Sequence, residues 1–173
     1  MRENKMMFFI FMLGTFTVGM AEYVVTGLLT QIADDMKVSI SSAGLLISVY
    51  AISVAVIGPY MRIFTLKVHG HRLLPILVAI FIVSNLVCML APNFNILLLS
   101  RLMSAAMHAR FFGVCMSVAA AVAPPAKKPQ AIALVQAGLT IAVMIGVPFG
   151  SFLGGFANWR TVFGVMILLA IIT

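Results

Sequence analysis

The chain has 173 residues, of which 63% are hydrophobic and only 9% are charged. About a quarter of the residues in a soluble domain are charged, so this composition excludes a water-soluble protein and indicates an integral membrane protein. The net charge of +7 does not indicate a nucleic-acid partner, because the basic residues lie in short segments between apolar runs, where membrane topology accounts for them.

Six apolar segments follow one another along the chain. A helix needs about 20 apolar residues to cross a membrane, so we predict an all-α integral membrane protein with a single transmembrane domain over residues 1–173. The predicted helices cover residues 7–29, 42–61, 73–91, 96–122, 131–156 and 161–173. The last of these is too short to span, and the sixth helix is therefore expected to be truncated, in a chain that is part of a longer protein or a truncated product.

The basic residues between the predicted helices fall mainly on one side of the membrane. That side carries Arg2, Lys5, Arg62, Lys67, Arg72, Lys127 and Lys128. The opposite side carries only Lys37 and Arg160. Cytoplasmic loops are enriched in lysine and arginine, so the N-terminus is predicted to be cytoplasmic.

Neither the histidine pair nor the cysteines indicate a metal site or a disulfide. His69 and His71 have no acidic or thiol neighbours, and their loop is better explained as a basic surface that faces phospholipid. Cys88 and Cys115 lie inside apolar runs, where a cysteine is expected to be a small packing residue. The sequence predicts no metal and no cofactor.

Three ionisable side chains lie inside predicted spans, namely Glu22, Arg101 and Arg110. A charge at the centre of a bilayer costs about 2.5–3.5 kcal/mol on insertion scales, so such residues are usually paired or functional. Glu22 and Arg101 lie about seven and five residues from the same predicted membrane surface, and a helix rises about 1.5 Å per residue. The two side chains are therefore at similar depth and can pair across a cavity.

The expected pair between Glu22 and Arg101 has three interpretations. Burial favours the neutral form of a carboxyl group, whereas a neighbouring arginine favours its charged form. Separating the two side chains, or admitting a cation, would therefore switch the protonation of Glu22, which is the physical basis of a proton-coupled carrier. A static ion pair that locks two helices together, and no contact at all, are the alternatives.

Two further polar residues follow Arg101 on the same predicted helix. His108 comes seven residues later and returns to nearly the same face, at about 100° per residue, so it can share an inward face with Arg101. It is either a cavity residue or a hydrogen-bonded packing residue. Arg110 points in roughly the opposite direction. It either extends toward the inner membrane surface or is a damaging substitution.

A glycine stripe marks the helix predicted over residues 131–156. The stripe consists of Gly138, Gly146, Gly150 and Gly154, with Pro148 among them. Small residues let helix backbones approach closely in lipid, and a proline can bend a helix. The stripe predicts tight packing or a gating interface, and these two roles are compatible.

Four groups of residues together have the order and spacing of a known transporter family. They are residues 21–29 with 31–36; Ser41, Ser42, Ala43 and Gly44 with Tyr50, Ala51, Gly58 and Pro59; Ser100, Arg101 and Leu102 with His108 and residues 111–113; and Ala137 and Gly138 with residues 146–150, residues 158–160 and Phe163. On these motifs the chain resembles the N-terminal half of a major facilitator superfamily transporter of the drug:proton antiporter type. Within that group it is most similar to bacterial arabinose-efflux, sugar-efflux and purine-efflux proteins.

The resemblance implies the N-terminal six-helix bundle of a twelve-helix carrier with a central cavity and alternating access. It implies a role in proton coupling for Arg101, for which Glu22 is the candidate partner. His108 and Tyr50 are candidates to line the cavity or contact the substrate. Gly146, Pro148 and Gly150 fall on the antiporter motif, although a valine separates the glycine and proline that are usually adjacent.

The chain also departs from the family pattern. Lys67, Gly70 and Arg72 match the basic cytoplasmic loop after the second helix, but the usual acidic residue of that loop is missing. Arg110 occupies a position that is usually uncharged. The second bundle of six helices is absent from the sequence.

These observations predict a multi-pass protein of the bacterial inner or plasma membrane that exports a small solute, such as a sugar, purine or drug, in exchange for protons. The alternative is a truncated, non-transporting membrane protein or an assembly partner with the same half-fold. No enzyme is expected, because no acid pair, nucleophile–base set or phosphate loop is present. The expected partners are the lipid bilayer, the solute, protons, and a second half-transporter chain or a second copy of this chain.

Overall fold

The computed structural model describes residues 2–173, and it describes the side chains of residues 6–70 and 72–173. The side chains of Arg2, Lys5 and His71 lie outside the described part. The helices are α1 (Arg2–Met36), α2 (Ile40–Phe64), α3 (Gly70–Leu90), α4 (Phe94–Val122), α5 (Lys128–Phe156) and α6 (Trp159–Ile172), with a short 3-10 helix, η1 (Pro125–Lys127). The predicted all-α class is confirmed.

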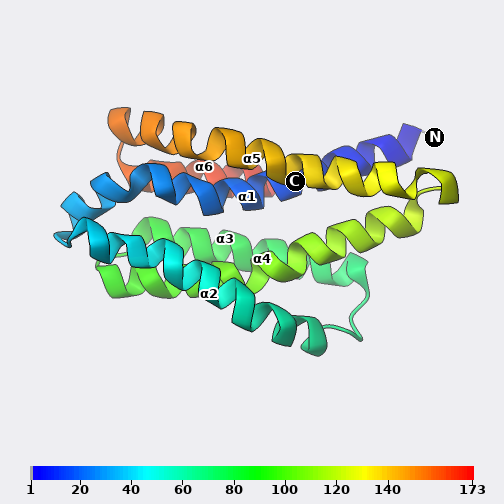
Figure 1. The fold of residues 1–173 in the computed structure, drawn as a ribbon, viewed down its shortest axis with the longest axis horizontal. Coiled ribbons are helices and arrows are strands. Elements are labelled where there is room, and N and C mark those ends of the chain that lie inside the picture. The colour runs from blue at the N-terminus through cyan, green and yellow to red at the C-terminus, as the bar shows by residue number, and fades with distance from the viewer. Residues whose placement is uncertain (1) are drawn as a thin grey trace.

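Five of these helices, α1 to α5, are long and apolar enough to cross a membrane. Helix α6 has 14 residues, which is shorter than a membrane-spanning helix of about 20 residues. The helices lie roughly along one direction, with α1, α5 and α6 on one side of the bundle and α2, α3 and α4 on the other (Figure 1). Each of the predicted apolar segments therefore corresponds to one helix of the bundle.

Side-chain caps determine where three of the helices begin. The side-chain oxygens of Ser39, Asn93 and Asn158 accept hydrogen bonds from backbone N–H groups in the first turns of α2, α4 and α6. The first-turn N–H groups of a helix have no partner within the helix, and a serine or asparagine cap satisfies one of them. These residues therefore fix where the chain re-enters a helix in the three connections α1–α2, α3–α4 and α5–α6.

Helix α1 extends beyond the predicted residues 7–29 at both ends. At its C-terminal end, residues 30–36 are helical and do not form part of a loop. Ile32 and Ala33 are buried, and their packing favours a further helical turn beyond the apolar segment. Lys37 then adopts a left-handed conformation with φ of 54°, and the Val38 N–H donates to the Ala33 carbonyl at 3.0 Å. A left-handed residue of this kind is a common helix terminator.

The glycine stripe of α5 lies against α1. An added Cβ would overlap the Met12 carbonyl oxygen at Gly138 and the Val24 carbonyl oxygen at Gly150. At Gly146 it would lie 2.7 Å from the Cβ of Tyr23. Only residues without a side chain let the two backbones approach this closely, so the predicted tight packing is present along the stripe, which also includes Gly154.

The buried side chains form two apolar clusters, one above the other along the bundle. On α1 the first cluster includes Ala21, and the second begins at Val24. On α4 the second cluster includes Leu97, and the first begins at Met107. The segments between these positions hold Glu22 and Arg101, so the intramembrane charges lie at the boundary between the two apolar clusters.

Candidate functional site

Arg101 and His108 lie on the buried face of α4, as the helical spacing predicts. Arg101 is 2% exposed and His108 is 9% exposed. Arg110 lies elsewhere on the helix, and its Nε donates to the Thr65 hydroxyl at 2.6 Å, just beyond the end of α2. The hydrogen bond to Thr65 gives Arg110 a partner outside the Arg101 cluster.

His108 connects α1 and α2 through its two ring nitrogens. Nδ1 lies 2.6 Å from the Tyr50 hydroxyl on α2, and Nε2 lies 3.5 Å from a carboxylate oxygen of Glu22 on α1. The ring stacks on Phe112 at a centroid separation of 4.7 Å. Two of the predicted cavity residues, Tyr50 and His108, are thus in direct contact.

The direct ion pair between Glu22 and Arg101 is not formed among the described residues. Arg101 Nη1 instead donates to the backbone carbonyl of Ala21 at 3.0 Å, while the Glu22 side chain turns toward His108. The two side chains therefore lie at similar depth, as predicted, but of the three interpretations the structure has the one without direct contact, and the carbonyl of Ala21 is the partner of Arg101. Helical spacing does not predict whether a carboxylate or a backbone carbonyl is the acceptor.

Two nitrogen atoms of Arg101 are buried without a partner in the described part of the chain. These are Nε and Nη2. The guanidinium carbon lies 4.3 Å from the centroid of the Tyr50 ring, a cation–π contact that does not use the N–H hydrogens of the guanidinium plane. A buried donor without an acceptor costs about 1–3 kcal/mol, so Arg101 retains the capacity to bind a carboxylate, water or another polar group.

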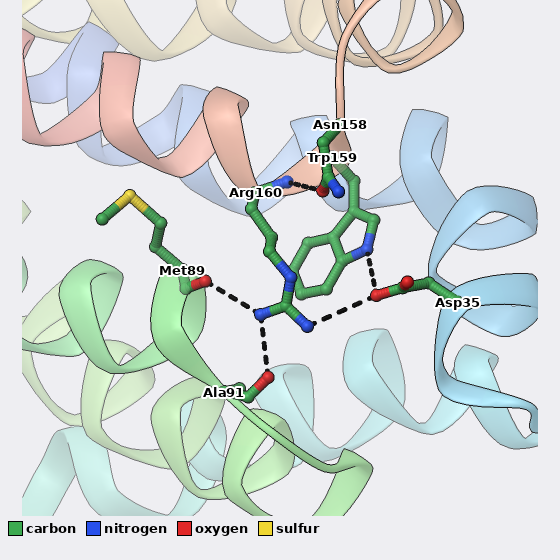
Figure 2. A network of polar contacts seen from close by, with 6 residues as sticks. All are labelled: Asp35, Met89, Ala91, Asn158, Trp159 and Arg160. Carbon is green, nitrogen blue, oxygen red and sulfur yellow. Dashed lines mark hydrogen bonds and ion pairs between the residues drawn. The ribbon is translucent and has the colours of Figure 1, made fainter.

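Arg160, predicted as a loop charge and as part of a family motif, organises a second polar network (Figure 2). Arg160 Nη1 donates to the carbonyls of Met89 at 2.9 Å and Ala91 at 2.8 Å, and Nη2 lies 3.3 Å from Asp35. The indole of Trp159 donates to the same Asp35 oxygen at 3.0 Å. The network joins the ends of α1 and α3 to the start of α6.

The motif of residues 158–160 contains Trp159 and Arg160, two members of this network. The motif supports the family resemblance but does not by itself indicate which groups these side chains contact. The partners of Arg160 are two backbone carbonyls at the end of α3 and a carboxylate more than 120 residues away. A backbone carbonyl leaves no mark in the sequence. Only the tertiary arrangement of the helix ends identifies it as a partner.

The remaining predicted residues lie away from the intramembrane cluster. Lys67 and Arg72 are exposed at the α2–α3 connection, and Gly70 begins α3. Gly70 and Arg110 line a small cavity of about 190 Å³. Among the described residues, no group of three or more histidine, cysteine or acidic side chains could hold a metal ion.

Comparisons with known proteins agree on one family. The sequence model described as Major Facilitator Superfamily matches residues 11–173. An "Uncharacterized MFS-type transporter", YfhI of Bacillus subtilis, is 46% identical over 168 residues, covering 97% of this chain and 42% of its own length. A "Probable sugar efflux transporter" of Helicobacter pylori is 36% identical over 158 residues, covering 91% of this chain and 40% of its own.

The fold also matches a solved structure. A bacterial homolog of the human lysosomal transporter Spinster, in an inward-facing and unoccupied conformation, has a TM-score of 0.80 and 21% identity, with 98% of this chain and 42% of that chain covered. At this identity the likeness describes the fold. The chain thus spans about two-fifths of the length of the relatives it matches, and these residues correspond to their N-terminal half.

Proposed function

Because the chain belongs to the Major Facilitator Superfamily, whose members are transporters and not enzymes, we propose that it supplies one half of a transporter that exports a small solute in exchange for protons. A sugar is the first solute to test, since a sugar efflux transporter is among its relatives, and purines and drugs follow. The observation that carries the proposal is the cluster of the half-buried Glu22 with the buried side chains of His108, Tyr50 and Arg101.

Glu22 is the proposed proton-binding group. Its side chain is 28% exposed, against 11% for His108, so it is the more accessible of the two. One carboxylate oxygen faces His108, and Arg101, with its two unpaired donors, is close enough for its charge to act on Glu22. A carboxylate that can move between these partners changes its preference for a proton as it moves, which is what coupled exchange requires.

The proposed transport path requires a second bundle. In this family the cavity lies between two six-helix halves, and this chain corresponds to one of them. A second half-transporter chain or a second copy of this chain would complete the path. In the same arrangement, the α1–α5 contact along the glycine stripe would act as the sliding interface, and the N-terminus would lie in the cytoplasm.

The alternative is a non-transporting membrane protein or an assembly partner. The chain spans 42% of the YfhI sequence, and a single bundle does not enclose a path that lies between two repeats. A protein of this kind would insert and fold in a bilayer without solute-dependent proton movement. The experiment below therefore distinguishes it from transport by two copies of this chain.

The test is solute-driven proton flux in proteoliposomes that contain this chain, compared with Glu22→Gln and Arg101→Ala. Asp34→Asn is the matched control, because it makes the same type of carboxyl-to-amide change at an exposed residue near the end of α1. We expect a solute to dissipate an imposed pH gradient with the parent chain and the control, and not with the other two variants. Equal flux in all four proteins would refute the coupling role of Glu22 and Arg101. No flux from the inserted parent across sugars, purines and drugs would refute a transporter formed by two copies of this chain.

A further inference from the structure

His108 is placed to bind two groups that belong to different helices. Its Nδ1 is 2.6 Å from the hydroxyl of Tyr50 on α2, and its Nε2 is 3.5 Å from the carboxylate of Glu22 on α1. A neutral imidazole carries one N–H and one bare nitrogen, so one side donates and the other accepts. We propose that His108 is a tautomeric switch, in which the charge state of Glu22 determines the hydrogen bond between α2 and α4. The proposal rests on the proposed role of Glu22 as the proton-binding group.

With Glu22 ionised, the geometry assigns one tautomer. A carboxylate only accepts hydrogen bonds, so the proton of the imidazole lies on Nε2 and is directed to Glu22. Nδ1 is then bare and accepts the hydroxyl proton of Tyr50. The 2.6 Å separation is at the short end of the range for hydroxyl donors, as expected for a strong donor facing a strong acceptor.

With Glu22 protonated, the roles are reversed. The carboxyl group now has a proton to donate, and Nε2, 3.5 Å from a carboxyl oxygen, can accept it. The imidazole exchanges its Nε2 proton for one on Nδ1, the phenol keeps its own proton, and the carboxylate holds the incoming one. The cluster thus gains one proton in total, and only O–H and N–H bonds are made or broken.

The consequence of the switch is a weaker connection between α2 and α4. In the second state an imidazole N–H donates to a phenol oxygen, which is a poorer acceptor than an imidazole nitrogen. Protonation of Glu22 on α1 would therefore loosen Tyr50 from His108 without touching α2 directly. A conformational change requires such a difference in contact free energy between two states.

The surroundings favour exchange between tautomers over a doubly protonated ring. The charged and titratable groups around His108 and Tyr50 are Glu22 and Tyr23 from α1 and Arg101 from α4 itself. Arg101 in turn lies near Cys88 of α3, outside this cluster. Arg101 already provides a positive charge, and a second one on His108 would be repelled in this buried setting. Stacking on Phe112 holds the ring plane, so the two nitrogens keep their separate partners.

The test is ¹⁵N NMR of His108 in the full chain in lipid bilayers. The variants His69→Gln and His71→Gln in the same chain leave His108 as the only histidine of the three. In this background we expect the protonated-nitrogen resonance to be at Nε2 at high pH and to move to Nδ1 in a single-proton step as the pH is lowered. We expect Glu22→Gln to abolish the pH step and the control Asp34→Asn to retain it.

Two results would overturn the proposal. One is a tautomer that does not change with pH in the parent chain, and the other is a ring that becomes doubly protonated as the pH falls. The measurement needs no transport, so a pH-dependent tautomer in a chain without flux would keep the switch and refute transport by two copies of this chain. Proton-coupled flux with a His108 tautomer that does not change with pH would support the proposed function and refute the switch.

Discussion

Replacing Gly146 with alanine tests how strongly the close contact between α1 and α5 holds the bundle together. The new Cβ would lie 2.7 Å from the Cβ of Tyr23 and 3.5 Å from the Val24 nitrogen. Carbon atoms in contact are ordinarily about 3.5–4.0 Å apart, so the two backbones must separate by about 1 Å at this point. Overpacking of this kind costs about 1–3 kcal/mol.

Alanine also has a higher helix propensity than glycine, by up to about 1 kcal/mol, and this gain would partly mask the packing effect. Gly155→Ala on the same helix provides the control, because its Cβ would meet no atom within 4 Å. Both variants share the propensity gain, so the difference between their unfolding free energies isolates the packing effect. We therefore expect Gly146→Ala to be less stable than Gly155→Ala by about 1–3 kcal/mol.

The assay is unfolding by sodium dodecyl sulfate in mixed micelles, followed by circular dichroism. Equal unfolding free energies for the two variants would refute the reasoning, because they would mean that α1 and α5 separate without loss. Because Gly146 faces Tyr23, the neighbour of Glu22, the same variant is also expected to lower any proton-coupled flux. Gly155→Ala is expected to leave that flux unchanged.

Three further predictions concern residues outside the Glu22 cluster. Arg160→Ala removes two carbonyl contacts and one carboxylate contact and should lower the unfolding free energy by about 1.5–3 kcal/mol. Asp35→Asn keeps an acceptor for Trp159 and should lower it by less than about 1 kcal/mol. An equal loss in the two variants would contradict the network. Cys88 and Cys115 are 3% and 0% exposed, so maleimide should label them only after denaturation; rapid labelling of the folded chain would show that they are accessible. Arg110→Ala loses its bond to Thr65 and should cost about 0.5–1.5 kcal/mol, measured by the same unfolding assay; an unchanged stability would show that this bond contributes nothing.

The hydrogen-bond partner of the buried Arg101 could not be predicted from the sequence. Helical spacing predicted correctly that Arg101 and His108 share a face and that Arg101 and Glu22 lie at one depth. It did not distinguish the carboxylate of Glu22 from the carbonyl of the preceding residue, Ala21, which accepts the hydrogen bond of Arg101, because spacing along a helix gives the depth of a residue and not the acceptor it offers. Nor did it identify Tyr50 as the partner of His108, although both had been marked as cavity candidates.

The sequence by itself determined the class of protein and the number of helices. A bilayer requires about 20 apolar residues for each span and requires every backbone polar group to be paired within the helix, so the elements can be recognised from composition and length alone. Capping residues such as Ser39, Asn93 and Asn158 also act locally, and they mark where helices begin. These features depend only on neighbours along the chain.

The tertiary structure alone decided which groups meet across helices. The extra helical turns of α1 depend on the burial of Ile32 and Ala33, and the Arg160 network depends on two carbonyls at the end of α3. Such contacts are decided over a few ångströms by how the helices are rotated and how closely they approach. Hydrophobic periodicity specifies the face and the depth of a residue, whereas its partner depends on the packing of the whole bundle.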